Sequence, residues 1–192
     1  NSNWLKEIGD KGVLAMICDS TNVFSLGKAG SESDVRKNLL KIIEKLNSKI
    51  IVTSFASNVA RMETIFYCAK ETGRQISLVG RSMHRIFKAA KKCGYLSEVI
   101  EPTDPRDAKK IPGKKIIYLC TGSQGEPMGA MTRISNNSHP DVSVEKGDTV
   151  IFSSKIIPGN EKKLYKLHNQ LVKEGINVVS EDNEFVHVSG HP

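Results

Sequence analysis

The sequence predicts an α/β fold with a doubly wound, mostly parallel sheet and helices on both faces. Short apolar runs alternate with longer segments whose apolar residues recur at helical spacing, five times over. This alternation is typical of parallel strands joined by right-handed crossover helices. Polar or glycine-containing loops follow the apolar runs, and such sheets bind ligands beyond the carboxyl ends of their strands. We therefore expect a Rossmann-like, three-layer domain with a ligand site along one edge of the sheet.

Composition limits the classes of protein to consider. The chain has 192 residues with 39% apolar content, which is enough for one well-buried domain. Its 28 Lys and Arg residues against 21 acidic ones give a net charge of +7. That charge favours a polyanionic partner such as RNA, although a solvated basic surface explains it equally well. No apolar run approaches the roughly 18 residues of a membrane span, so we expect no membrane partner. The chain begins without Met, which suggests a piece of a longer protein.

The four cysteines lie far apart, without a C-x-x-C pair or a preceding secretory signal. They are Cys18, Cys68, Cys93 and Cys120. This pattern is typical of buried thiols in a cytosolic protein.

Each expected element is marked by an apolar run or by capping residues. Ser31 and Asp34 form a capping box that starts a helix, and Asn160 is the expected cap of a later one. Gly73 and Gly175 are the expected ends of two helices. The expected strands cover residues 12–18, 49–54, 75–79, 116–120, 148–153 and 177–180. The expected inward stripes are Val35, Leu39, Ile42, Ile43 and Leu46; Val59, Met62, Ile65, Phe66 and Ala69; Ile86, Phe87, Ala90 and Cys93; and Leu164, Leu167, Leu171 and Val172.

Two connections are less regular. Residues 95–112 contain several prolines and leave room only for a short edge strand at residues 97–100. The segment that follows Pro127 has the character of a helix start.

The central stretch, residues 116–131, joins a buried strand to a loop of small polar residues. Residues 121–125 supply hydroxyls, an amide and unobstructed N–H groups, which can surround a phosphate or a nucleotide edge. A plain strand-to-helix turn is the alternative, but similar clusters follow the other strands. These clusters are residues 19–22, 54–58, 80–82, 121–125 and 153–160. The recurrence favours a ligand site, and the absence of G-x-G-x-x-G and G-x-x-x-x-G-K motifs argues against dinucleotide and P-loop binding.

Individual charged residues admit two interpretations. Arg81, beside Ser82, is either a phosphate contact or an ordinary surface arginine. Glu32 lies in the first turn of its helix, where a carboxylate can simply offset the helix dipole. His187 and His191 bracket Val-Ser-Gly, so an extended chain followed by a turn would project both rings from one edge, although structural roles remain open. Of the other histidines, His84 and His168 are expected at a helix surface or boundary, and His139 in a loop.

We expect a phosphate pocket where three of these segments converge. The carboxyl ends of parallel strands share one rim, which would bring together Ser123, Ser153 and Ser154, and His187 with Ser189. Hydroxyls, N–H groups and an imidazole suit phosphate oxygens. A closed pocket of this kind favours a 5′-monophosphate end over a triphosphate.

Six motifs, in order along nearly the whole chain, support a named resemblance. They are DSTN at Asp19, SFASN at Ser54, GRSM at Gly80, LCTGSQGEPM at Leu119, GDTVIFSSKIIPGN at Gly147 and HVSGH at His187. With these motifs the chain resembles the bacterial ribonuclease J family, metallo-β-lactamase-fold nucleases that carry a β-CASP insertion.

This resemblance implies a zinc-dependent ribonuclease of the cytoplasm, with 5′-to-3′ exonuclease and endonuclease activity in RNA maturation and decay. Asp19 matches the aspartate that bridges two zinc ions. Glu32 and His191 match the acidic residue and the histidine of the first two β-CASP motifs, and are the expected catalytic residues. His187 and Ser189 match residues that hold an RNA phosphate.

The resemblance also implies boundaries and missing parts. Residues 1–22 would be a flanking segment of the metallo-β-lactamase fold, residues 23–182 would form the β-CASP domain, and residues 183–192 would be the return segment into the metallo-β-lactamase fold. The family's H-x-H-x-D-H cluster would precede Asn1, and a further ligand would follow Pro192. The chain alone is therefore expected to be inactive and to bind little zinc, whereas the full-length protein would be a dimer or tetramer. The alternative is a self-sufficient doubly wound domain that binds a phosphorylated small molecule.

Overall fold

The computed structural model describes residues 2–17 and 30–188 and divides the chain into two compact units. One unit comprises residues 1–29 and 190–192, and the other is Gly30–Ser189. In the first unit, helix α1 (Ser2–Lys11) is an element that the sequence analysis did not predict.

The strand predicted at residues 12–18 is not found over its described part. Residues 12–17 form no strand, and the side chains of Leu14 and Ile17 are fully exposed. A strand is stable only when its N–H and C=O groups pair with a neighbour, and no strand of the described chain pairs with these residues.

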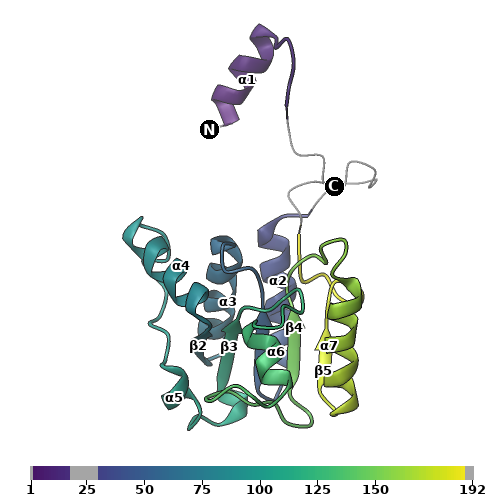
Figure 1. Ribbon diagram of the computed structural model, residues 1–192. Coiled ribbons are helices and arrows are strands. Elements are labelled where there is room, and N and C mark those ends of the chain that lie inside the picture. The colour runs from purple at the N-terminus through teal and green to yellow at the C-terminus, as the bar shows by residue number, and fades with distance from the viewer. Residues whose placement is uncertain (1, 18–29, 189–192) are drawn as a thin grey trace. The chain divides into compact units, whose positions relative to one another are not determined.

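The second unit contains a five-stranded, all-parallel sheet, which confirms the predicted fold class. The strand order is β2-β3-β1-β4-β5 (Figure 1). The strands are β1 (Ile50–Thr53), β2 (Gln75–Val79), β3 (Ile116–Cys120), β4 (Thr149–Phe152) and β5 (Asn177–Val179). The register pairs Thr53 with Cys120 and Phe152, so the loops after the three central strands begin side by side.

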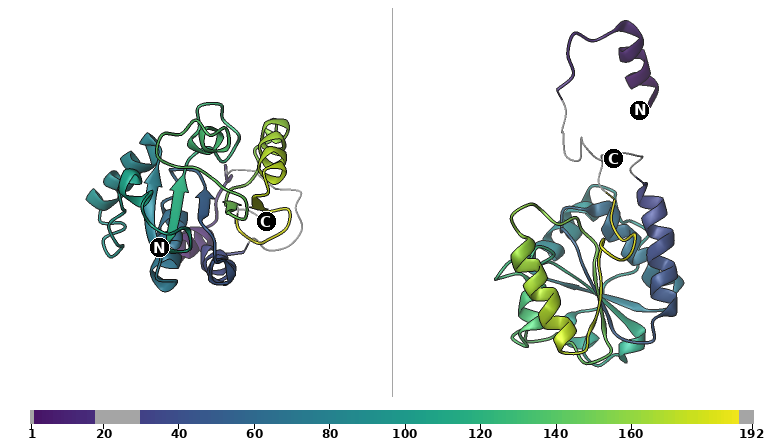
Figure 2. Two further views of the ribbon diagram at one scale, coloured as in Figure 1. Left: turned by 90° about the horizontal axis from the view of Figure 1, so that it is seen from below. Right: turned by 90° about the vertical axis from the view of Figure 1, so that its right-hand side faces the viewer.

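Helices cover both faces of this sheet, as predicted. Alternate strand residues point to opposite faces, so Ile50 and Val52 enter one core and Ile51 enters the other. Helices α2 (Glu32–Lys45), α3 (Val59–Glu71) and α4 (Arg81–Lys92) contribute to the first core. Helices α5 (Pro105–Ala108), α6 (Ala130–Ser135) and α7 (Glu161–Lys173) contribute to the second. Figure 2 (right) shows α2 and α7 on opposite sides of the sheet, and a 3₁₀ turn (Gly113–Lys115) leads into β3.

Local capping explains most helix boundaries. The Ser31 side chain accepts the Asp34 N–H at 3.2 Å while the Asp34 carboxylate accepts the Ser31 N–H at 3.1 Å, which confirms the capping box. Gly73 and Gly175 follow two helix ends with positive φ, as expected. Asn160 occupies its predicted N-cap position but makes no capping bond, because its amide faces Gln124 Oε1 at 3.5 Å.

Three smaller predictions are wrong. No strand forms at residues 97–100, because Leu96, with φ of 54°, turns the chain out of the extended conformation. Val172 is exposed, because it lies about 100° around the helix from the buried Leu171. Cys93 is exposed at the C-cap of α4, where the chain leaves the core, whereas Cys68 and Cys120 are buried.

The connections that follow β1 and β4 leave for opposite faces of the sheet. The chain leaves β1 for α3 on one face and leaves the adjacent β4 for α7 on the other. Such a divergence between neighbouring parallel strands is a topological switch point, where α/β sheets bind ligands.

Substitution of Gly122 would test how closely the loop after β3 packs against α6. Its φ is +104°, and an added Cβ would lie 2.9 Å from the backbone nitrogen of Met131 in α6. Gly159 also has a positive φ of +94° but nothing near the added carbon, so it isolates the backbone strain. We expect Gly159→Ala to cost about 1–2 kcal/mol of unfolding free energy and Gly122→Ala clearly more. Urea denaturation measures both, and equal losses would contradict this account.

Candidate functional site

A buried arginine lies beneath the switch point. Arg61, in the first turn of α3, is completely buried, and its Nε and Nη2 atoms donate to the two carboxylate oxygens of Glu32 at 2.8 and 2.9 Å. Its Nη1 atom donates to the Ser153 carbonyl at 2.9 Å, to Ser153 Oγ at 2.6 Å and to the Val186 carbonyl at 2.9 Å. We call Arg61, Glu32, Ser153 and Val186 the arginine clamp. It ties the start of α2 and the start of α3 to the end of β4 and to the chain near residue 186.

The carboxylate in this clamp stays ionised. Burial alone would raise the pKa of Glu32, but hydrogen bonds and charge from Arg61 outweigh it. The Thr64 hydroxyl donates to Glu32 Oε1 at 2.8 Å and lowers the pKa further, so the pKa lies below its ordinary value. Both oxygens of Glu32 therefore serve the ion pair, and its side chain is 24% exposed. In the described residues Glu32 positions Arg61, and its catalytic role stays a prediction.

A glutamine joins the two polar loops that the sequence analysis singled out. Gln124 is buried, and its Nε2 donates to the Lys155 carbonyl at 2.8 Å and to Ser154 Oγ at 3.4 Å. Its Oε1 accepts the Ile157 N–H at 2.9 Å. The loop after β3 is thus fastened to the loop after β4. Ser123, beside Gln124, is buried, and its hydroxyl has no hydrogen-bond partner within the residues that the structure describes.

His187 completes this edge. It follows Val186, whose carbonyl accepts the Ser153 hydroxyl at 2.7 Å, so the histidine lies next to the end of β4. Its Nδ1 atom is buried and without a partner in the described part of the chain. Burial, followed by the charge of Arg61, lowers the pKa of His187 from 6.5 to about 4; Lys155 adds to this and Glu32 opposes it. The imidazole is therefore neutral at pH 7.

The structure brings together the segments of four predicted phosphate-binding residues, namely Ser123, Ser153, Ser154 and His187, through Gln124 and the arginine clamp. Asp19, Ser189 and His191 lie outside the described residues. His168, expected at a helix surface or boundary, is buried, and its ring centroid lies 4.2 Å from that of Phe152.

The described residues do not supply a metal-ligand set. Nowhere in residues 2–17 and 30–188 do three or more His, Cys, Asp or Glu side chains gather as a metal site requires. The predicted zinc ligand Asp19 is not among these residues, so zinc binding through Asp19 stays a prediction.

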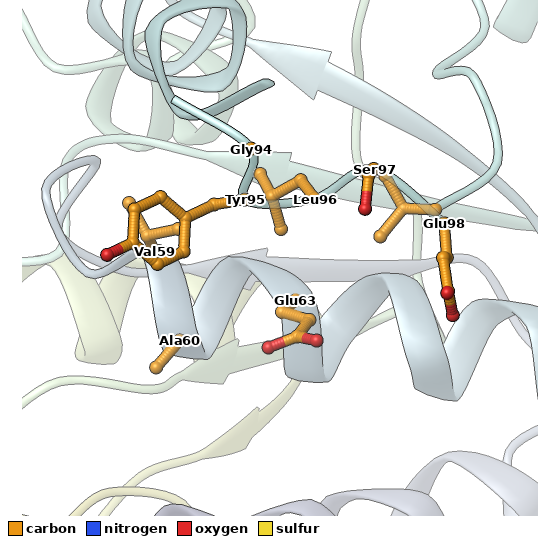
Figure 3. Close-up of a pocket in the computed structure, with 9 residues that line it drawn as sticks. Val59, Ala60, Glu63, Gly94, Tyr95, Leu96, Ser97 and Glu98 are labelled. Atoms are coloured by element: carbon orange, nitrogen blue, oxygen red, sulfur yellow. The ribbon is translucent and has the colours of Figure 1, made fainter. Parts of the chain in front are cut away.

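A separate cavity of about 390 Å³ lies between α3 and the segment after α4. Figure 3 shows Val59, Ala60 and Glu63 on the helix facing the chain from Gly94 to Glu98. Its two charged lining residues, Glu63 and Glu98, are carboxylates, which would repel a phosphate.

Sequence reasoning missed Arg61 and the role of Gln124. Arg61 lies one residue before the inward-facing Met62, so the apolar stripe gives no sign that it is buried. The available signal is the pairing of an acid in the first turn of one helix with an arginine in the first turn of the next. That signal can be interpreted only once the two helices are known to pack together.

Together, the switch point, the polar loops and the buried clamp define an α/β domain that presents hydrogen-bond donors along the carboxyl edge of its sheet. The family described as Ribonuclease J, beta-CASP domain, matches residues 47–171. The chain belongs to this family, as its motifs suggested. It is 40% identical over 188 residues to Ribonuclease J of Sinorhizobium meliloti, covering 97% of this chain and 33% of that protein.

Other relatives agree. Ribonuclease J 1 of Streptococcus pyogenes is 40% identical over 96% of this chain, and Ribonuclease J of Thermus thermophilus is 35% identical over 96%. The chain spans about a third of the length of these relatives, at 33% and 32% respectively.

Among the described residues, no helix is long and apolar enough to cross a membrane.

The arginine clamp should dominate the stability of this edge. Arg61→Met would remove the counter-ion of the half-buried Glu32 carboxylate and one donor to each of the Ser153 and Val186 carbonyls, so we expect a loss of about 3–5 kcal/mol of unfolding free energy. The matched control is Arg106→Met, because Arg106 pairs with Asp104 at 3.2 Å at an exposed position away from the clamp, and exposed ion pairs contribute little to stability. Chemical denaturation gives both values. A loss for Arg61→Met no larger than that of the control would refute the clamp's importance.

His187 should make stability depend on pH. Its folded pKa of about 4 lies below its ordinary 6.5, so the unfolded chain binds the extra proton between these values. The contribution is fully present above pH 6.5 and is lost as the pH falls towards 4. We expect His187→Gln to flatten the fall in unfolding free energy over this window. Identical pH slopes for both proteins in urea titrations would show that His187 is not protected from protonation.

Proposed function

We propose that this domain is the RNA-binding part of a ribonuclease, and that an RNA phosphate lies against the loops after β1, β3 and β4. The observation that supports this most directly is that Ser123 Oγ and His187 Nδ1 are both buried without a partner in the described chain. Buried polar atoms are almost always hydrogen-bonded, and a ligand or water can supply the partner. Atoms of Thr53, Ser77, Thr132 and His168 also lack a partner in the described chain, so what distinguishes Ser123 and His187 is their place beside the joined loops. Both belong to residues predicted to hold a phosphate.

The neighbouring residues Ser153 and Ser154 have different hydrogen-bonding roles. Ser154 Oγ accepts from Gln124 and donates to no acceptor among the described residues, so its proton is available to a phosphate oxygen. The Ser153 proton is committed to the Val186 carbonyl at 2.7 Å. Ser153 therefore acts by holding the segment that carries His187, while Ser123, Ser154 and His187 are the proposed phosphate contacts among the described residues. Ser189, outside those residues, stays a predicted contact.

A neutral His187 suits selection of a 5′-monophosphate. A bound phosphate dianion would raise the pKa of the ring and could share a proton with it, whereas the nearby Arg61 is already neutralised by Glu32. A closed pocket between these joined loops would exclude a triphosphate, which needs more room. RNA with a 5′-monophosphate is accordingly the proposed ligand.

The full-length protein would be a metal-dependent hydrolase of RNA, in keeping with relatives named Ribonuclease J. Two zinc ions, one ligand being Asp19, would supply charge stabilisation at the attacking and leaving oxygens. Glu32 and His191 are the proposed catalytic residues, with Glu32 acting through the clamp. Exonuclease and endonuclease activity, assembly as a dimer or tetramer, and a cytoplasmic location are further parts of this proposal.

The test measures binding of fluorescent RNA to the full-length protein without added divalent metal. RNA with a 5′-monophosphate should bind more tightly than the same RNA with a 5′-hydroxyl. His187→Ala should remove about 1.5–3 kcal/mol of that preference, the value of a hydrogen bond to a charged group. Ser154→Ala should act in the same direction. The control is Ser143→Ala, an exposed residue whose carbonyl contacts Lys49 at the opposite edge of the sheet. Equal binding of the two RNAs by the unaltered protein would refute the proposed site.

A further inference from the structure

A second cavity opens on the same edge of the sheet, at the carboxyl ends of β2 and β3. Its volume is about 510 Å³. The polar residues that line it are Arg81, Ser82, His84, Thr121, Arg133, His139 and Asp141. In the strand order β2-β3-β1-β4, this basic cavity lies on the far side of β1 from the Ser154 loop.

The charge around this cavity is mainly positive. Arg81 and Arg133 line it, and Asp141 is the one acid among its lining residues. An adjoining cavity of about 350 Å³ is lined by Arg81, Ser82 and Arg85. The guanidinium groups of Arg81 and Arg85 have no hydrogen bond or ion pair with any described residue, whereas that of Arg106 nearby is paired with Asp104. Unpaired guanidinium groups beside a cavity are suited to bidentate contact with a phosphate.

A neutral hydrogen-bond donor, the ring of His139, also lines this cavity and suits a phosphate. His139 Nδ1 accepts the N–H groups of Asp141 at 3.3 Å and Val142 at 3.2 Å, so the ring proton resides on Nε2 and can be donated. Burial, followed by the charge of Arg133, lowers the pKa of His139. The ring is therefore a neutral donor near pH 7.

The start of α4 is also left uncapped. Its N-cap residue is Gly80, with φ of 108° and no side-chain cap. A Cβ on this residue would lie 2.8 Å from Thr121 Oγ1, so the packing of β2 against the loop after β3 excludes a capping side chain. The N–H groups of the first turn consequently remain available beside Arg81 and Ser82.

We propose that the basic cavity is a second phosphate-binding site, which takes a backbone phosphate of the RNA strand whose 5′ end is held at Ser154 and His187. This inference rests on the proposed function. The two sites lie two to three strand spacings apart along the edge, roughly 10–14 Å, so a short stretch of single-stranded RNA can occupy both. Contacts to guanidinium and N–H groups at the cavity are made to phosphate and carry no base specificity.

The experiment compares two ligands with 5′-monophosphates, a dinucleotide too short to reach both sites and a decanucleotide. Binding to the full-length protein is measured by fluorescence anisotropy over a range of salt concentrations, without added divalent metal. The variants are Arg81→Ala and Arg81→Ala with Arg133→Ala. The control removes the same charge by Lys41→Ala with Lys166→Ala, at exposed positions in the middle of α2 and α7. Arg81→Ala alone removes a side chain without a partner among the described residues, so it should leave folding intact.

The double variant should weaken decanucleotide binding by about tenfold, as removal of a charge-assisted hydrogen bond would. The slope of log affinity against log salt should become shallower by about 0.7 for each phosphate that the variant no longer neutralises. Dinucleotide binding should be unchanged, and the control should leave both ligands and the slope unchanged.

Other outcomes separate this inference from the proposed function. Equal effects of the double variant and the control overturn the second site. A matching loss of dinucleotide binding also overturns it, because the cavity would then hold the 5′ end itself. A third outcome is that inorganic phosphate binds the protein only when Arg81 is present, while the double variant binds the decanucleotide as tightly as the unaltered protein does. That result would assign the cavity to a free phosphorylated compound and overturn the RNA contact. If the double variant binds the decanucleotide more weakly but His187→Ala has no effect on binding, the result supports this cavity and refutes the site at His187.

Discussion

The ion pair between Arg61 and Glu32 is the constraint on which the candidate site depends. A guanidinium without solvent contact is costly unless its N–H groups meet acceptors, and here the acceptors come from three other segments. Displacing the start of α2, the end of β4 or the chain near Val186 would leave a buried charge with fewer partners. The clamp thereby fixes where Ser154 and His187 lie, although neither residue touches Glu32 through a hydrogen bond in the described chain.

The edge above the clamp carries two kinds of hydrogen-bond donor. Near β1 and β4 the donors are neutral, because Glu32 balances Arg61 and burial keeps His187 unprotonated. Near β2 and β3 the donors are charged guanidinium groups around an open cavity. In the two proposals above, the neutral donors would discriminate one terminal phosphate, whereas the charged donors would favour any phosphate of a strand. The loop after β3 borders both, since Gln124 binds the loop after β4 and Thr121 lines the cavity.

Two glycines at this edge, Gly80 and Gly122, show how closely the loops approach the neighbouring elements. Gly122 leaves no room for a Cβ against Met131, and Gly80 leaves none against Thr121. In each case a side chain would separate a loop from the element beneath it. The same two glycines adopt positive φ, so close packing and backbone conformation both require glycine at these positions.

The sequence by itself determined the sheet, most helices and their caps. The apolar runs of the strands, the Ser31 capping box and the terminal glycines are local properties that neighbouring residues specify. Local pattern predicted a strand at residues 12–18 that is not found over the described residues 12–17, because strand formation depends on pairing that no local pattern contains. Only the tertiary structure decided that Arg61 is buried, that Gln124 joins two loops, and that Arg81 and Arg133 border one cavity. These relations connect residues far apart in the chain, and their energy arises from desolvation and contact geometry, which exist only after the elements have packed.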